Sequence, residues 1–226
     1  QDRSSAASDV YKRQCILCQQ LKSSSVYYFL AYAGGLKLIH LIQMLEQPTF
    51  IDQTSGTVLL SKNADLPLPP ASMSKLMTLY MTFEFIKAGR LGLNEKLPVS
   101  KNAANYTGST MFLDPTDRVA VIDLIKGIIV LSGNDACAVI AEALSPDGTE
   151  AGFAKLMTQR AKQLGLKNST FKNSNGWPAA GHQMSVRDLS LLAERLITDF
   201  PEYYPMFAEQ TYDCLLYTSP SPRDLW

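Results

Sequence analysis

Ser72 and Lys75, a serine followed three residues later by a lysine, form the arrangement in this sequence best suited to chemistry. A serine hydroxyl is a poor nucleophile until a base takes its proton, and residues three apart on a helix project from the same face. The spacing makes Ser72 a candidate acyl-enzyme nucleophile. Such a spacing arises by chance about once in a chain of this length, and Ser169 with Lys172 is a second instance.

The residues around Ser72 distinguish it from Ser169. Pro69 and Pro70 precede Ser72 and predict an extended chain just before it, while the apolar run 73–86 predicts a buried helix. Ser72 is then expected at a helix N-terminus, where free backbone amides and the helix dipole favour a developing anion. Ser169 lies in a polar and β-branched stretch without helical period, which offers no such geometry.

Ser132-Gly133-Asn134 is a second candidate motif, in the short connection between two apolar helical runs, 119–131 and 135–144. A serine and an asparagine on a short buried link can relay the nucleophile's proton and hold a substrate amide. Taken alone, each motif has a simpler interpretation, as a helix cap or an inter-helix turn, and Ser61-Lys62-Asn63 matches the second pattern by chance. Both motifs in this order favour the catalytic interpretation.

With their surroundings, these motifs resemble the low-molecular-weight penicillin-binding proteins, which are serine-type D-alanyl-D-alanine carboxypeptidases of peptidase family S11. The resemblance covers roughly residues 50–213. It is carried by short segments spread along the chain: Phe50-Ile51-Asp52, Thr54-Ser55-Gly56, Asn63-Ala64-Asp65, Pro70 to Thr78, Met111-Phe112-Leu113, Asp123 to Gly127, Ser132 to Ala136, Leu164 to Thr170, Asn175-Gly176 and Met184 to Leu189.

The resemblance implies an α+β protein with the β-lactamase/penicillin-binding transpeptidase-like fold. The helical subdomain is expected to be present and the antiparallel sheet to be incomplete at the C-terminus. In this family pattern Ser72 is the acylated nucleophile, Lys75 its base, Ser132 the proton relay and Asn134 a ligand for the substrate's peptide carbonyl. No metal and no cofactor are implied.

The family's third motif is lysine, then threonine or serine, then glycine, and it is expected downstream of Asp213. The nearest match, Lys87-Ala88-Gly89, closes the predicted Ser72 helix and lies on the wrong side. Without the third motif the site lacks the group expected to hold the substrate's terminal carboxylate and half of its oxyanion hole. We therefore expect a truncated domain that is inactive as printed.

Both ends of the sequence are expected to be technical in origin. Residues 4–14 and 214–224 can be back-translated into the two adaptors of transposase-based sequencing, facing inward, so 1–14 and 214–226 are excluded from fold reasoning. A natural disordered tail at each end is the alternative. Residues 15–47 remain unassigned, as a signal peptide or an out-of-frame segment, and 48–213 are expected to be the partial catalytic domain.

Composition and charge are compatible with one domain and argue against nucleic-acid binding. The chain has 226 residues, 46% of them hydrophobic, which is enough for a substantial core. Its 21 basic and 21 acidic residues balance, so no basic surface is indicated. Cys137 is expected to be a buried small hydrophobe, while Cys15 and Cys18 form a lone pair without a second ligand pair. No run is long and apolar enough to indicate a transmembrane span.

The function implied by the resemblance is removal of the terminal D-alanine from peptidoglycan stem peptides, with β-lactams as covalent inhibitors. It would take place in the periplasm, at the extracytoplasmic face of the bacterial inner membrane, with membrane association only through segments absent here. A class A-like β-lactamase is one alternative, but Glu84, Glu142 and Glu194 lack the E-x-x-L-N partners of a deacylating glutamate. A non-catalytic penicillin-fold binding or scaffolding protein is the other, with Ser72 as a cap and Lys75 as a solvated charge.

The elements that must position these residues are read from hydrophobic period and turn signals. A hairpin is predicted from 50–52 and 57–60, with Gly56 in its turn. Helices are predicted over 72–87, 121–131, 135–144, 152–164 and 185–197, the last capped by Ser185. Loops 106–110 and 173–184 are expected beside the site, with His182 as a solvated histidine. Met73, Met77 and Met81 form a helical stripe expected to fill the core.

Overall fold

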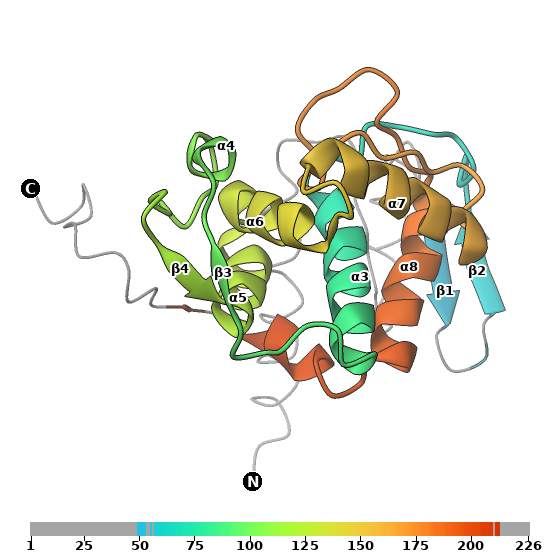
Figure 1. Ribbon diagram of the computed structural model, residues 1–226. Coiled ribbons are helices and arrows are strands. Elements are labelled where there is room, and N and C mark those ends of the chain that lie inside the picture. The colour runs from blue at the N-terminus through green and yellow to red at the C-terminus, as the bar shows by residue number, and fades with distance from the viewer. Residues whose placement is uncertain (1–48, 53–54, 56, 210, 213–226) are drawn as a thin grey trace, which may run out of the picture.

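A computed structural model describes residues 49–52, 55, 57–209 and 211–212. The predictions for residues 1–14, 15–47 and 214–226, including the Cys15 and Cys18 pair, lie outside the described residues. In the described part, helix α3 (Lys75–Lys87) lies in the middle of the molecule. Helices α5 (Val121–Leu131) and α6 (Asn134–Leu144) lie on one side of it and α8 (Val186–Asp199) on the other. Helix α7 (Glu150–Gln163) packs against α3 and α6 (Figure 1).

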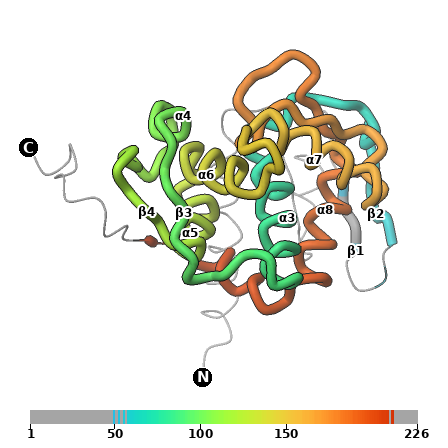
Figure 2. Tube along the Cα trace, in the orientation of Figure 1, coloured from blue at the N-terminus to red at the C-terminus, as the bar shows by residue number. Residues whose placement is uncertain are grey.

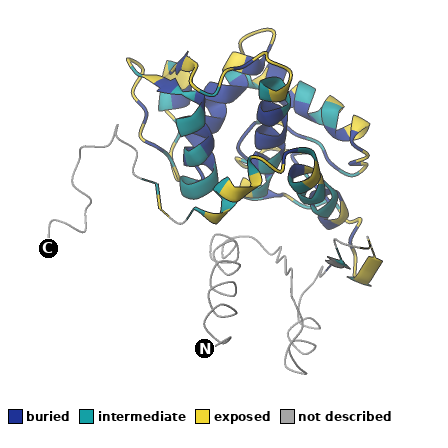
Figure 3. Cartoon of the chain, turned by 90° about the horizontal axis from the view of Figure 1, so that it is seen from below, coloured by how far each residue is buried: buried dark blue, intermediate teal, exposed yellow. Residues whose placement is uncertain are grey.

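Helix α3 is buried on most sides, as its nearly continuous apolar sequence predicts. Met77 and Phe83 are completely buried, and the helix packs against α6, α7 and α8. The hydroxyls of its two buried threonines both donate to backbone carbonyls, Thr82 to Thr78 at 2.7 Å and Thr78 to Ser174 at 2.6 Å. Figure 3 shows the buried residues gathered on the inward faces of the helices. The predicted core helix is therefore confirmed, and it forms the axis of the fold.

The start of this helix differs from the prediction. A single 3₁₀ turn, η1 (Ala71–Ser74), carries Ser72, and the α-helix begins at Lys75. The chain before Ser72 is not extended, because Pro70 has α-region angles (φ −82°, ψ −9°) and Ala71 has φ +47°. The proline rule restricts the residue before a proline and does not reach Ala71, where tertiary contacts fix the backbone.

The remaining predicted helices form close to their expected limits. Helix α5 has the predicted bounds, α6 begins one residue early and α7 two residues early. The Ser185 hydroxyl caps α8 by accepting a hydrogen bond from the Asp188 amide at 3.2 Å, and the Thr149 hydroxyl caps α7 in the same way through Gly152. Cys137, Met77 and Met81 are buried in the core, as expected, whereas Met73 of the same predicted stripe is half-buried and packs against it.

The strands form two separate antiparallel pairs. In the predicted hairpin, β1 (Thr49–Asp52) pairs with β2 (Thr57–Ser61), and the register shifts between Phe50 and Ile51. This hairpin lies on the outer side of α8 (Figure 2). Val58 and Leu59 of β2 are exposed, Leu59 by 69%. The described residues thus have the expected α+β character with a small antiparallel sheet.

Several short elements were not predicted. Strands β3 (Lys96–Pro98) and β4 (Arg118–Ala120) form the second pair, and the short helices α4 (Lys101–Ala104) and η2 (Tyr204–Ala208) complete the order. These segments are too short to show a period of their own. Among the described residues, none of the helices has the length and apolar character needed to span a bilayer.

Candidate active site

The structure brings Ser72, Lys75 and Ser132 together at the N-terminal end of α3. Lys75 Nζ lies 3.1 Å from Ser72 Oγ, 2.9 Å from Ser132 Oγ and 2.8 Å from the Ser132 carbonyl oxygen. The Ser72 residue is exposed, whereas Lys75 beneath it is only 4% exposed. The two predicted motifs, 57 residues apart in the sequence, therefore meet at one ammonium group.

Two features of the local backbone place Ser72 above Lys75. The 3₁₀ turn and the first turn of α3 are continuous, because the Lys75 amide bonds back to the Ser72 and Met73 carbonyls. Gly176 lies directly against this turn. A β-carbon on Gly176 would lie 1.7 Å from the Ala71 carbonyl oxygen, and the residue has φ +86°, so only glycine fits there. The loop that carries Gly176 therefore supports the turn of Ser72.

The burial of Lys75 lowers its pKa, although Cys137 and Asp135 oppose the shift. In the described part of the chain, no carboxylate lies within ion-pair distance of Nζ. Both partner side chains are hydroxyls, which can donate as well as accept, so the same contacts also suit a neutral amine. A lowered pKa increases the neutral fraction of Lys75, and a neutral Lys75 can accept the Ser72 proton.

Ser132 and Asn134 occupy the predicted tight connection. Ser132 ends α5 in the left-handed conformation (φ 57°, ψ 37°), and Asn134 is the first residue of α6. The Asn134 side-chain amide donates to the Thr107 carbonyl at 2.8 Å, and its backbone amide donates to the Ser109 carbonyl at the same distance. Asn134 is therefore fixed by the loop 106–110, which is in turn held at its far end by hydrogen bonds from the Met111 amide to the Asp135 carboxylate.

The interpretation of His182 as a solvated loop residue is wrong. His182 is 4% exposed, and its Nε2 lies 2.7 Å from the hydroxyl of Ser74. In the sequence, Ser74 lies between Ser72 and Lys75. Nδ1 accepts a hydrogen bond from the Lys172 amide at 3.3 Å, so the contacts suit a neutral ring with its proton on Nε2. The loop that carries His182 folds back onto α3, a contact across 108 residues that no local pattern indicates.

We expect the stability of the chain to fall between pH 6.5 and pH 4 because of His182. Burial lowers the pKa of His182 to about 4, with Lys172 acting in the same direction and Glu150 against it. The unfolded ring takes up its proton near pH 6.5 and the folded ring only near pH 4, so stability is full above 6.5 and is lost as the pH falls. The total loss is about 3 kcal/mol.

Thermal unfolding followed across this range measures the effect, with His182→Gln as the matched variant. Glutamine can keep a hydrogen bond to Ser74 but does not titrate, so the slope between pH 6.5 and 4 should disappear. Asp65, Asp114 and Asp147 have pKa values lowered below 3.8 and therefore titrate beneath this window. An equal slope in the variant and the parent chain would contradict the assignment.

The second serine–lysine pair has a structural role. Ser169 is buried, and its hydroxyl donates to Asp188 Oδ2 at 2.7 Å in the first turn of α8. Within the residues that the structure describes, no three His, Cys, Asp or Glu side chains are grouped so as to hold a metal ion. The candidate site therefore consists of Ser72, Lys75, Ser132 and Asn134.

Sequence reasoning missed Glu150, which lies between the two loops beside the site. Its carboxylate accepts hydrogen bonds from Tyr106 on one loop and Ser174 on the other. The only local signal is a glutamate in the first turn of a helix, which is a common capping position.

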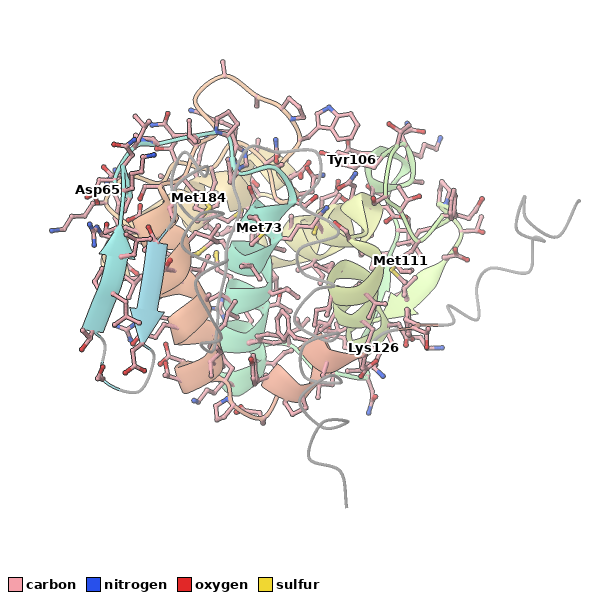
Figure 4. The ribbon with its side chains drawn as sticks, turned by 180° about the vertical axis from the view of Figure 1, so that it is seen from behind. Asp65, Met73, Tyr106, Met111, Lys126 and Met184 are labelled. Carbon is pink, nitrogen blue, oxygen red and sulfur yellow. The ribbon has the colours of Figure 1, made fainter. Side chains whose placement is uncertain are left out.

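Figure 4 shows Met73 at the end of α3, with Tyr106 toward the α6 side and Met184 toward the α8 side.

Comparisons with known proteins identify a single family. Residues 46–219 match the family model of peptidase S11, described as D-alanyl-D-alanine carboxypeptidase. The D-alanyl-D-alanine carboxypeptidase DacC of Escherichia coli is 41% identical over 168 residues, which are 72% of this chain and 42% of that protein. This chain spans about half the length of the curated relatives it matches.

Solved structures resemble the chain over a similar extent. The D-alanyl-D-alanine carboxypeptidase DacD of Francisella tularensis superimposes with a TM-score of 0.67 and 38% identity, over 70% of this chain and 38% of that one. Penicillin-binding protein D2 of Listeria monocytogenes, in its ampicillin-bound form, gives a TM-score of 0.61 and 30% identity, over 69% and 63%.

Proposed function

This chain belongs to the D-alanyl-D-alanine carboxypeptidase family, peptidase S11, and on that premise we propose that it is the Ser72-bearing part of a serine carboxypeptidase that acts on peptidoglycan stem peptides. One observation carries the proposal: the buried Lys75 Nζ lies within 3.1 Å of both the Ser72 and Ser132 hydroxyls. A nucleophile, a base of lowered pKa and a second hydroxyl within reach are the parts that acyl transfer requires.

The reaction would proceed through an ester on Ser72. Lys75 takes the hydroxyl proton as Ser72 Oγ attacks the carbonyl carbon of the penultimate D-alanine. The carbon–nitrogen bond then breaks, and the leaving amine of the terminal D-alanine receives a proton through Ser132. Water attacks the ester in the second half, giving the shortened peptide as its carboxylate and restoring the Ser72 hydroxyl. The proton transfers in these steps use the groups that surround Lys75 Nζ.

Asn134 would hold the substrate's peptide group during this reaction. Its side-chain amide has two donor hydrogens and an acceptor oxygen, so the bond to the Thr107 carbonyl leaves capacity for a substrate amide. The proposed oxyanion hole uses the Ser72 backbone amide together with an amide from a later strand. Hydrogen-bond donors placed where negative charge develops are the usual means of stabilising such an intermediate.

β-Lactams are proposed to acylate Ser72 covalently, a proposal supported by the ampicillin-bound structure of the Listeria relative. The class A-like β-lactamase alternative has less support. Glu84 is paired with Arg160 and Glu142 accepts a hydrogen bond from Asn102, so both carboxylates are engaged elsewhere. The scaffolding alternative requires Lys75 to be a solvated charge, but Lys75 is buried, which disfavours this alternative.

Activity is proposed to need a further segment with the third motif, because no lysine-threonine-glycine or lysine-serine-glycine follows Ser132 in this sequence. Such a segment would supply the second amide of the oxyanion hole and the cation for the substrate's terminal carboxylate. The whole protein is proposed to act at the extracytoplasmic face of the bacterial inner membrane, where its substrate is located.

A labelling experiment on two forms of the chain tests the function. The extended chain consists of this sequence through Asp213, continued by the C-terminal segment of a full-length family member. We expect the extended chain to bind a fluorescent penicillin covalently, one molecule per protein, and to release D-alanine from a stem pentapeptide. The chain as printed should do neither.

Two results would contradict the proposal. Release of D-alanine by the printed chain would show that the further segment is not needed. A cooperatively folded extended chain that neither takes up label nor releases D-alanine would favour the scaffolding alternative.

A further inference from the structure

One carboxylate, that of Glu150, joins the two loops on either side of the candidate site. Oε2 accepts a hydrogen bond from the Tyr106 hydroxyl at 2.5 Å, and Oε1 accepts two from Ser174, from its amide at 2.9 Å and its hydroxyl at 2.5 Å. Glu150 is the first residue of α7, where the helix dipole favours a negative charge. The carboxylate is thus held on a rigid element while it binds two loops.

The loop that carries Tyr106 leads directly to Asn134. Thr107, the next residue, offers the carbonyl that accepts the Asn134 side-chain amide at 2.8 Å. Burial, together with the hydrogen bond to Glu150, raises the pKa of Tyr106, so its hydroxyl stays protonated and donates. A displacement of Tyr106 would therefore move the only described partner of the Asn134 side chain.

The loop that carries Ser174 leads to the nucleophile turn. The Ser174 carbonyl accepts the hydroxyl of Thr78, one helical turn beyond Lys75, at 2.6 Å. Two residues further on, Gly176 packs against the Ala71 carbonyl. The two loops also touch each other directly, since the rings of Tyr106 and Trp177 meet edge to face at 6.2 Å.

We propose that Glu150 is a positioning residue, which sets the spacing of the two loops and so holds Asn134 in register with Ser72. Glu150 does not itself touch the reacting atoms. It acts along two short chains of contacts, through Tyr106 and Thr107 to Asn134, and through Ser174 and Gly176 to the turn of Ser72. The expected effect of Glu150 on rate rests on the proposed acylation of Ser72, whereas its hydrogen bonds to the two loops do not depend on that proposal.

The test compares two single variants of the extended chain. Glu150→Ala removes the hydrogen bonds to both loops, and Tyr106→Phe removes one hydroxyl but keeps the ring contact with Trp177. Displacing a reacting group by about 1 Å can cost roughly a hundredfold in rate. We expect the rate of acylation by a β-lactam, per folded molecule, to fall roughly a hundredfold in Glu150→Ala and about tenfold in Tyr106→Phe. Glu150→Gln should recover part of the loss, because its amide can still bind one loop.

The matched control is Glu142→Ala, which removes a half-buried helix carboxylate with a single described partner, Asn102. It should change acylation by less than twofold. Hydrogen exchange gives a readout that is independent of activity. The Ser174 amide and residues 105–110 should exchange faster in Glu150→Ala and should be unchanged in Glu142→Ala. If Glu150→Ala does not fold, Tyr106→Phe and Glu150→Gln carry the same comparison.

A double-variant comparison separates positioning from general destabilisation. If Tyr106 acts through Asn134, Tyr106→Phe should have little further effect on acylation once Asn134 is alanine. Additive losses, or acylation within twofold of the parent in both Glu150→Ala and Tyr106→Phe, would overturn the proposal. An extended chain that shows faster exchange in Glu150→Ala but no acylation in any form would instead overturn the proposed function alone.

Discussion

Replacing Ser72 by alanine is expected to abolish covalent penicillin labelling of the extended chain. The label is an ester on the serine oxygen, and Ser72 offers an exposed hydroxyl 3.1 Å from a buried amine of lowered pKa. Alanine removes the only atom that can form that ester while keeping the 3₁₀ turn. Labelled protein separated on a denaturing gel, together with the intact mass, measures the result.

Ser169→Ala is the matched control, since Ser169 has the same spacing to a lysine. Its hydroxyl is buried and donates to the Asp188 carboxylate, so it is not presented to a substrate. Loss of this hydrogen bond to a carboxylate should cost about 2 kcal/mol of stability and leave the amount of label nearly unchanged. Label that persists in Ser72→Ala, or that disappears in Ser169→Ala with the fold intact, would sink the assignment of the nucleophile.

Lys75→Arg has the second largest expected effect, a fall in the acylation rate of roughly a thousandfold or more, in the range that loss of a general base causes. Arginine keeps the positive charge but cannot be deprotonated in a protein, so it cannot take the Ser72 proton. Burial lowers the pKa of Lys75 and thereby increases its neutral fraction near pH 7. The time course of penicillin uptake at saturating protein measures the rate.

The pH dependence and a control variant complete the test of Lys75. A base must be neutral to act, so acylation should be lost as the pH falls below the lowered pKa of Lys75 and should rise to a plateau above it. Lys172→Arg, at the exposed lysine of the other serine–lysine pair, should leave both the rate and the profile unchanged. An arginine variant at position 75 that acylates within tenfold of the parent would reduce Lys75 to a purely electrostatic role.

Local pattern was enough to predict much of this fold. The apolar runs predicted the four helices α5 to α8 to within two residues at each end, and Ser185 was correctly placed as a cap. These features depend on hydrogen bonds and side-chain contacts within about four residues, which sequence spacing reports directly. The spacing of Ser72 and Lys75 belongs to the same class, because one turn of helix brings them together.

What the sequence determined by itself was therefore the set of helices, the two motifs and the family to which they point. Tertiary structure decided how these parts meet. The bond from Lys75 to Ser132 spans 57 residues, and the contact of Ser74 with His182 spans 108. No local period encodes such distances, since they result from how α3 packs against its neighbours. For the same reason His182 was predicted to be solvated, Glu150 went unnoticed, and the left-handed backbone at Ala71 became evident only from its packing against Gly176.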